Sequence, residues 1–321
     1  MQIAKSAKLK NSKFESNDVR IESGARLQDV FIKAKKVIIK SNATLTNCKL
    51  FSDGVVTIGE NTTVKEQVII NAFKSIYIGD RTIIDRDVTI GGMQSEKSEI
   101  EIGNDCVVLY RSYLNVTRKI SIGNNVGIGG YCLIFTHSAW QNVLNGNPYK
   151  FAEVEIKDNA WLPWNVTVMP GITINKDVTI GSGSVITKNL PSGVFAAGIP
   201  AKVIRKKATG NLSKTNKNNI MLEILSDFQG YASQFLQLNS IAINSNNCII
   251  TSSKKDRLVY TKDFKKIKNN DVIISFKIPD QIKRNHEWIE LDSLYSHTTR
   301  DIAKYFISFV RRYGIKIKPN S

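Results

Sequence analysis

His137 is the one histidine in the first 285 residues of this 321-residue chain. It lies where a regular apolar pattern breaks off and a long irregular loop, residues 135–155, begins. An imidazole can accept and release a proton near neutral pH, and a loop that closes over it can exclude water. His137 is therefore a candidate general base, and the alternative is a polar loop residue without a chemical role.

A thiol nucleophile is a second chemical option, because Cys132 lies five residues before His137. Residues two apart on a strand share a face, so Cys132 is expected to point inward with Ile134. A covalent route through Cys132 is therefore not expected. No metal is expected either, because the chain has no CxxC pair or histidine pair at metal-ligand spacing. The residues concerned are Cys48, Cys106, Cys132, Cys248, His286 and His297.

Composition predicts an ordinary folded protein of two domains, with 42% hydrophobic and 23% charged residues. No leader or membrane span is predicted, so a cytoplasmic location is expected. The net charge of +17 is spread along the chain, with an excess of nine cations in residues 1–210 and eight in residues 211–321. This spread argues against a nucleic-acid partner and favours an anionic cofactor, an anionic glycan or a membrane surface.

The elements that position His137 are indicated by a repeat of six residues. Neither a helix, with a period of about 3.6, nor a two-sided strand, with a period of about 2, explains this spacing. Short strands joined by tight turns do, with one aliphatic side chain per hexapeptide pointing inward. The groups are Ile58, Val64 and Ile70; Ile78, Ile84 and Ile90; Ile102, Val108 and Leu114; Ile122, Ile128 and Ile134; and then Ile156, Leu162, Val168, Ile174, Ile180 and Ile186.

Insertions into this repeat fall at one place only. Spacing within a group is always six, whereas successive groups are separated by 8, 12, 8, 22 and 6 residues. If three hexapeptides make one coil of a triangular prism, all the extra residues emerge at one corner, which is the corner of His137. About two degenerate coils are expected upstream as a cap. Their inward residues are Ile21 and Leu27, then Ile39, Leu45 and Phe51.

A family resemblance rests on Tyr149 to Lys207, YKFAEVEIKDNAWLPWNVTVMPGITINKDVTIGSGSVITKNLPSGVFAAGIPAKVIRKK. This segment resembles the end of the maltose, galactoside and polysaccharide O-acetyltransferase branch of the hexapeptide-repeat acyltransferases. There a YxxPVxIGxxVWIG-like segment precedes VTKxxPxxxxxxGxPAKxIR. The resemblance implies an all-β left-handed parallel β-helix, an exception to the right-handed crossover rule. We expect about six clear and about two degenerate coils in residues 1–207.

By this resemblance the same segment binds acetyl-CoA, which needs a groove with a basic end. Ser182 on the GSGS turn would let the pantetheine arm approach the backbone, and Thr187 with Lys188 would lie near the pyrophosphate and adenine. Arg205, helped by Lys202, would meet the 3′-phosphate through charge-assisted hydrogen bonds. The alternative is that this basic end is a solvated exit from the prism.

The resemblance also makes His137 the general base, because FTHSAW matches the family's T-x-H position. The imidazole would take the proton of the acceptor hydroxyl during attack on the thioester and then protonate the departing sulfur. Backbone amides near Trp164 are candidates for stabilising the oxyanion. In WLPW the chain departs from the family, which has Ile-Gly and a small residue there. Trp161 matches the family's tryptophan, whereas Trp164 either contacts the pantetheine arm, narrows the acceptor channel or packs on the surface.

Candidates for binding the acceptor lie near the loop, and each has a structural role as its alternative. Aromatic faces and amide groups suit a sugar. The family forms trimers with active sites between prisms, so a homotrimer with a carbohydrate acceptor is expected. The candidates are Arg111, Tyr113 and Asn115, expected to end their triplet at the insertion corner, and Trp140, Asn142 and Tyr149 in the loop.

The period stops after Arg205, and residues 208–217 are predicted to be a polar linker. Residues 218–321 are predicted to form a small α+β accessory domain. This domain could bind the glycan acceptor, extend the trimer contact or dock membrane-bound polysaccharide machinery, and the sequence does not choose. The predicted elements are a helix in 220–238, strands in 241–253, 257–262 and 271–278, and a helix over 298–314 with Thr298 or Thr299 as N-cap and Gly314 as its stop.

The expected function is acetyl-CoA-dependent O-acetylation of a sugar hydroxyl, with a bacterial surface polysaccharide or its precursor as acceptor. N-acetylation of an amino sugar or nucleotide sugar is an alternative, because it needs the same base and donor. A hexapeptide carbonic anhydrase is excluded, because it needs three histidines per zinc and the prism has one. A repeat scaffold without activity is the other alternative, and failure to bind CoA would favour it.

Overall fold

The computed structural model describes residues 1–235, 238–243, 248–252 and 256–320. Its contacts divide the chain into two compact units, Met1–Gly210 and Asn211–Ser321. No helix of the described residues is long and apolar enough to cross a membrane.

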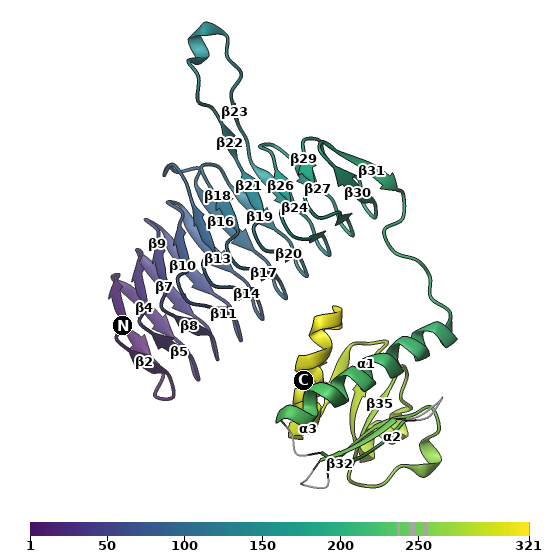
Figure 1. The fold of residues 1–321 in the computed structure, drawn as a ribbon. Coiled ribbons are helices and arrows are strands. Elements are labelled where there is room, and N and C mark those ends of the chain that lie inside the picture. The colour runs from purple at the N-terminus through teal and green to yellow at the C-terminus, as the bar shows by residue number, and fades with distance from the viewer. Residues whose placement is uncertain (236–237, 244–247, 253–255, 321) are drawn as a thin grey trace. The chain divides into compact units, whose positions relative to one another are not determined.

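The first unit is a parallel β-helix of three sheets, in which each coil adds one strand to each sheet (Figure 1). The first sheet comprises β1 (Gln2–Ile3), β4 (Asp18–Ile21), β7 (Lys36–Ile39), β10 (Val55–Ile58), β13 (Ser75–Ile78), β16 (Glu99–Ile102), β19 (Ile120–Ile122), β24 (Val154–Ile156) and β27 (Thr173–Ile174). The second comprises β2 (Lys8–Lys10), β5 (Arg26–Gln28), β8 (Thr44–Thr46), β11 (Thr63–Val64), β14 (Ile83–Ile84), β17 (Val107–Val108), β20 (Gly127–Ile128), β25 (Trp161–Leu162), β28 (Thr179–Ile180), β30 (Phe195–Gly198) and β31 (Ala201–Arg205). The third comprises β3 (Lys13–Glu15), β6 (Phe31–Lys33), β9 (Lys49–Phe51), β12 (Ile69–Asn71), β15 (Thr89–Gly91), β18 (Tyr113–Asn115), β21 (Leu133–Phe135), β26 (Thr167–Val168) and β29 (Val185–Ile186).

The predicted parallel β-helix and its six-residue period are confirmed. Inward aliphatic residues of successive coils lie in register, as Ile58 does with Ile78 and Ile70 with Ile90. These side chains are fully buried and form one continuous column. Each contributes about 1.5–3 kcal/mol relative to an exposed position, so the column is the main source of stability of the unit.

Two of the three corners are tight turns that contain a residue in the left-handed region. Asn and Asp adopt this conformation at low cost. The third corner, between the third and first sheets, varies in length and contains the insertions, as predicted; between β26 and β27, where there is no insertion, it is a tight turn with Gly171 in the left-handed region. The left-handed residues include Asn61, Asp105 and Asn125 at the first corner and Gln67, Asp87 and Arg111 at the second.

The first and third sheets contain nine strands each, which is one coil more than the approximately eight that were predicted. The missed coil is the first, at residues 2–15, where Ile3 and Leu9 are 42% and 36% exposed. An end coil is covered on one side only, so its apolar pattern is weak. The inward residue of β9 is Leu50, which lies in register with Ile70, and the prediction of Phe51 was wrong. The preceding turn is one residue shorter there.

The second unit is a mixed sheet with helices. Among the described residues its strand order is β32-β33-β34-β35-β36-β37-β38. Phe228 of one helix packs between Phe306 and Phe309 of another, with ring centroids 5.3 and 5.4 Å away. The strands are β32 (Leu238–Ile243), β33 (Cys248–Ser252), β34 (Arg257–Tyr260), β35 (Asp271–Ser275), β36 (Glu287–Glu290), β37 (Tyr295–His297) and β38 (Lys318–Pro319). The helices are α1 (Lys214–Phe235), α2 (Asp280–Asn285), α3 (Asp301–Val310), η2 (Phe264–Lys266) and η3 (Arg311–Tyr313).

Three predictions for this unit need correction. Helix α1 begins at Lys214, so the end of the predicted linker is helical. The strand expected over 241–253 is two strands, β32 and β33, and residues 244–247 and 253 lie outside the described residues. The N-cap of α3 is Arg300, because the hydroxyls of Thr298 and Thr299 instead donate hydrogen bonds to the Glu287 carboxylate.

Candidate active site

His137 begins a short hairpin that leaves the β-helix at the third corner (Figure 1). Its strands are β22 (His137–Ser138) and β23 (Lys150–Phe151), which pair antiparallel, and η1 (Val143–Asn145) lies between them. The half-buried imidazole stacks on the Phe151 ring, with centroids 5.7 Å apart and planes inclined by 29°. The hairpin thus holds the ring against an apolar surface at the edge of the coil.

Asn115, the last residue of β18, orients His137. Its Oδ1 lies 3.0 Å from Nδ1 of His137. The same oxygen accepts from the backbone N–H of Thr117 at 3.2 Å, which identifies this atom as the amide oxygen. An amide oxygen can only accept, so Nδ1 carries the proton and the lone pair of the imidazole lies on Nε2.

The surroundings of Asn115 leave little freedom for its side chain, which is 3% exposed. Its Nδ2 donates to the Tyr113 hydroxyl at 3.0 Å, and the Thr136 hydroxyl lies 3.3 Å from Oδ1. A Cβ at Gly92 would lie 3.1 Å from the Asn115 amide and 2.8 Å from Thr117 Oγ1, so glycine provides the space. The His137 imidazole and the Asn115 amide are therefore held in a fixed geometry by the protein itself.

Arg118 and Thr136 complete this cluster and were not among the predicted site residues. The Arg118 guanidinium carbon lies 5.0 Å from the centre of the Phe151 ring, the same ring on which His137 stacks. The backbone N–H of Arg118 donates to Thr136 Oγ1 at 2.9 Å. The sequence offered one signal: Thr136 directly precedes His137, and Arg118 lies in the preceding insertion at the same corner.

Cys132 is fully buried beneath β21, as expected from its alternation with Ile134. Its thiol donates to the carbonyl oxygen of Pro163 at 3.0 Å. Burial raises the pKa of this thiol to about 11, so it stays protonated at neutral pH. The geometry therefore gives no support to an acyl-cysteine.

The predicted acceptor residues on the third triplet lie at opposite ends of β18. Tyr113 and Asn115 are near the hairpin, with the Tyr113 ring 6.2 Å from Phe135. Arg111 is not at this corner: it lies in the turn before β18, in the left-handed region. There its guanidinium donates to the Tyr131 hydroxyl at 3.2 Å and pairs with Asp87 at 3.6 Å. The prediction grouped Arg111 with Tyr113 and Asn115 at the insertion corner. The turn that contains Arg111 lies at the other end of β18, so this placement was wrong.

The loop candidates Trp140, Asn142 and Tyr149 lie on the hairpin beyond His137. Trp140 and Tyr149 are 99% and 63% exposed. Asn142 is the N-cap of η1, and its side-chain oxygen accepts from the backbone N–H of Leu144 at 3.0 Å. Of these three residues, Tyr149 is the one near His137, because its ring lies 6.5 Å from that of Phe151, on which His137 stacks.

Trp161 and Trp164 lie over glycines of the neighbouring coil. A Cβ at Gly127 would meet the Trp161 ring at 2.3 Å, and one at Gly130 would meet Trp164 at 2.6 Å. Trp164 also packs edge-on against Tyr110, with ring centroids 5.2 Å apart. Each indole is more than one-third exposed, so both offer apolar surface as well as packing.

The other cofactor candidates are exposed and lie at two corners. Ser182 is in the turn above Trp164, where Gly183 N–H donates to the Trp164 carbonyl at 2.9 Å. Thr187 and Lys188 follow β29 and therefore lie at the third corner, on the side of the hairpin. The set is thus divided between the two ends of β29.

Lys202 and Arg205 lie on β31, the last strand of the β-helix, and both are exposed. The Arg205 guanidinium carbon is 4.8 Å from the centre of the Phe195 ring. A small-residue turn, exposed indoles and a basic strand are the features that a long anionic thioester requires. Within the described residues no group of three His, Cys, Asp or Glu side chains could hold a metal ion.

Comparison with known proteins relates this β-helix to sugar O-acetyltransferases. The chain is 30% identical over 157 residues to galactoside O-acetyltransferase of Escherichia coli K12, covering 49% of this chain and 66% of that protein. It is 26% identical over 189 residues to WbbJ of the same organism, named for O-acetyl transfer in lipopolysaccharide biosynthesis, covering 55% and 88%. A solved structure of the polysialic acid O-acetyltransferase OatWY matches with a TM-score of 0.38 and 20% identity, covering 64% of this chain and 91% of that one.

No protein-family model matches the chain. The alignment also spans just under two thirds of the galactoside O-acetyltransferase. In its six-residue repeat, its parallel β-helix and its sequence relatives, the chain is similar to acetyltransferases of the hexapeptide-repeat class.

Proposed function

We propose that this protein transfers the acetyl group of acetyl-CoA to a hydroxyl group of a sugar, with His137 as general base. The observation that supports it most is the hydrogen bond between His137 Nδ1 and the buried Asn115 amide oxygen. It leaves the Nε2 lone pair available on a ring whose orientation is fixed. A general base needs this tautomer, and a histidine without a chemical role does not.

The proposed reaction proceeds in two steps. The acceptor hydroxyl oxygen attacks the thioester carbon while its proton passes to Nε2, which gives a tetrahedral intermediate and an imidazolium. Collapse of the intermediate breaks the carbon–sulfur bond, and the imidazolium returns the proton to the departing sulfur. The Asn115 oxygen stabilises the imidazolium throughout, because it accepts from Nδ1.

For the donor we propose a path along the last coils, with Trp161, Trp164 and Ser182 beside the pantetheine arm. Lys202 and Arg205 would then bind the 3′-phosphate, and Thr187 with Lys188 the pyrophosphate. Because these residues are divided between two corners, we propose a homotrimer in which a neighbouring β-helix completes the donor groove. No resident metal is required, since the base is an imidazole.

The proposed acceptor is a bacterial surface polysaccharide or its precursor. The name of WbbJ, which refers to O-acetyl transfer in lipopolysaccharide biosynthesis, supports this class, and we propose a cytoplasmic reaction because acetyl-CoA is a cytoplasmic metabolite. Tyr113 and Tyr149 are the proposed sugar contacts nearest to the base. The alternative acceptor is an amino group, which the same base would serve.

The test is to identify the product. The protein is incubated with acetyl-CoA and a panel of capsular and lipopolysaccharide glycans, and the glycans are analysed by mass spectrometry before and after mild alkali. The proposal predicts a gain of acetyl groups that alkali removes, because esters are labile. Alkali-stable acetylation would indicate an amine acceptor instead, and absence of CoA binding would indicate a scaffold.

A further inference from the structure

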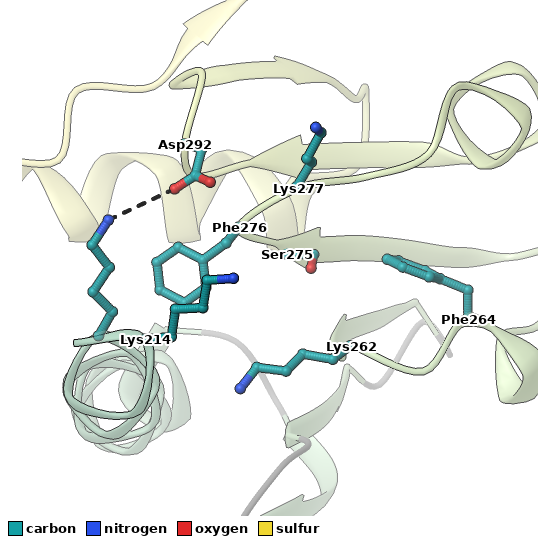
Figure 2. Close-up of a pocket in the computed structure, with 8 residues that line it drawn as sticks. Lys214, Lys262, Phe264, Ser275, Phe276, Lys277 and Asp292 are labelled. Atoms are coloured by element: carbon teal, nitrogen blue, oxygen red, sulfur yellow. Dashed lines mark ion pairs between the residues drawn. The ribbon is translucent and has the colours of Figure 1, made fainter.

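A basic pocket in the second unit is not used by the proposed reaction. The pocket has a volume of about 400 Å³ and lies at one end of the strands of the sheet. Figure 2 shows the side chains of Lys214 and Lys262 extending into the same space from two different elements. The lining residues are Lys214, Lys217, Lys262, Phe264, Ser275, Phe276, Lys277 and Asp292.

The topology places this pocket where sheets commonly bind ligands. Strands β34, β35 and β36 are parallel neighbours, and the pocket residues Lys262, Ser275 and Asp292 lie at or just beyond their carboxyl ends. The amino end of α1 provides the wall opposite, through Lys214 and Lys217. Ligands of open sheets bind in the crevice outside the carboxyl ends of parallel strands.

The charge of the pocket is unbalanced. Lys217 Nζ lies 4.0 Å from Oδ1 of Asp292, which is the one acidic residue that lines the pocket. Within the described part of the chain, Lys214, Lys262 and Lys277 have no ion-pair partner. Helix α1 also has no acidic residue in its first turn. Cations at the amino end of a helix are disfavoured by the helix dipole, so this wall is stabilised when an anion binds.

The remaining lining favours a ring over a bare ion. Phe276 and Phe264 supply apolar faces, and the Ser275 hydroxyl supplies a hydrogen-bonding group. The Lys217 ammonium is 5.9 Å from the centre of the Phe276 ring, so charge and aromatic surface adjoin. A volume of about 400 Å³ is within the range of small-molecule sites. Sugar rings use aromatic faces and hydroxyl partners, whereas an inorganic anion needs neither.

We propose that this basic pocket binds an acidic saccharide, a sugar that carries a carboxylate or phosphate group. Lys214 and Lys262 hold the anionic group, and Phe276 contacts the ring. The role of this binding rests on the proposed function, because the bound saccharide would be an acidic acceptor glycan that the protein acetylates. Binding itself does not depend on His137, so the two can fail separately.

The test is isothermal titration calorimetry on the full chain with three probes. These are a galacturonic acid tetrasaccharide, a phosphorylated mannose oligosaccharide and neutral maltotetraose. At least one acidic probe is expected to bind at least about tenfold more tightly than maltotetraose, and added salt is expected to weaken this binding. The two acidic probes distinguish a carboxylate from a phosphate ligand.

Matched variants separate the pocket from general charge. Lys214→Gln with Lys262→Gln is expected to weaken the acidic probe at least about tenfold. The control, Lys268→Gln with Lys304→Gln, removes the same charge from exposed sites on the amino side of β35 and on α3, and it is expected to keep the affinity within about twofold. Retained folding of each variant is verified by circular dichroism and thermal unfolding.

Three results would overturn the proposal. The first is equal affinity for the acidic and neutral probes, and the second is an equal loss of affinity in the two double variants. The third is that inorganic phosphate binds as tightly as the acidic saccharide and displaces it completely. His137→Ala is expected to bind the probe as tightly as the native chain. If that binding is found but no glycan is acetylated, the proposed function fails and the pocket remains. If acetylation is found without pocket-dependent binding, the pocket fails and the function remains.

Discussion

At the scale of residues, the site depends on one buried amide. Asn115 and His137 are 22 residues apart in sequence, yet one hydrogen bond fixes the tautomer of the imidazole. The sequence singled out His137, because its position and surroundings matched a family motif, and its role as general base stays a prediction. It placed Asn115 near the site but as an acceptor residue, since neither spacing nor composition reveals where its amide oxygen points.

Substitution of Asn115 tests this arrangement. Asn115→Ala is expected to lower kcat about 10- to 100-fold, because the imidazole loses its fixed orientation and tautomer. Asn115→Asp keeps an acceptor oxygen and is expected to recover activity. It is also expected to move the acidic limb of the pH–rate profile to higher pH, because a carboxylate stabilises the imidazolium.

A second substitution at the same cluster is Tyr113→Phe, which removes the hydroxyl that accepts from Asn115 Nδ2, leaves the oxygen side intact and, at a proposed sugar contact, is compared through kcat rather than KM. Tyr113→Phe is expected to lower kcat less than Asn115→Ala does. Steady-state kinetics with native-like circular dichroism give the comparison. An Asn115→Ala enzyme with unchanged kcat would contradict the positioning role.

At the scale of elements, the repeat was predictable because every coil has to bury the same inward positions. Its failures have physical reasons. The first coil is half exposed, so Ile3 and Leu9 are under weaker constraint than the inner hexapeptides. In the second unit α1, α3 and three strand segments were predicted, but α2, the strands β36 to β38 and the N-cap of α3 were not. The hydroxyls of Thr298 and Thr299 donate hydrogen bonds to the carboxylate of Glu287, which lies outside the helix, so neither threonine caps α3.

Three successive coils are joined at the insertion corner by Glu99. Its carboxylate accepts from Lys74 Nζ at 2.8 Å and from the Ser75 hydroxyl at 3.0 Å, and Lys119 lies 3.7 Å away. Burial raises the pKa of this carboxyl, but the Lys74 and Ser75 hydrogen bonds and the charge of Lys119 outweigh it. The net effect holds the pKa below its ordinary value of 4.5.

Glu99→Gln is therefore expected to lower the free energy of unfolding by about 1–2 kcal/mol at neutral pH. A lowered folded-state pKa contributes stability above the unfolded-state value, and this contribution disappears as the pH falls through the folded-state pKa. Urea denaturation across this pH range measures it. Glu96→Gln, an exposed carboxylate in the same insertion, is the control, and an equal effect of both substitutions would contradict the account.

At the scale of the whole molecule, the hairpin presents an apolar surface that the β-helix does not cover. Trp140 and Leu144 are 99% and 91% exposed. Exposed large apolar side chains grouped on one projection are typical of protein–protein contacts. Together with the donor residues divided between two corners, they support the proposed trimer, in which the hairpin packs on a neighbouring β-helix.

Trp140→Ser with Leu144→Ser is expected to shift the protein from trimer to monomer and to lower activity with it. The physical reason is the loss of buried apolar area at the contact. Light scattering after size-exclusion chromatography measures the mass, and Gln141→Ser, an exposed polar change beside Trp140, is the control. A native protein that is monomeric at all concentrations would contradict the trimer.

The measurement that tests the central claim most directly is acceptor-dependent release of CoA thiol by the native protein and by His137→Ala. Binding of acetyl-CoA is measured in the same samples. The account predicts a loss of about 10²- to 10⁴-fold in kcat with unchanged acetyl-CoA binding, the contribution expected of a general base. Turnover by His137→Ala within about tenfold of the native rate would contradict it.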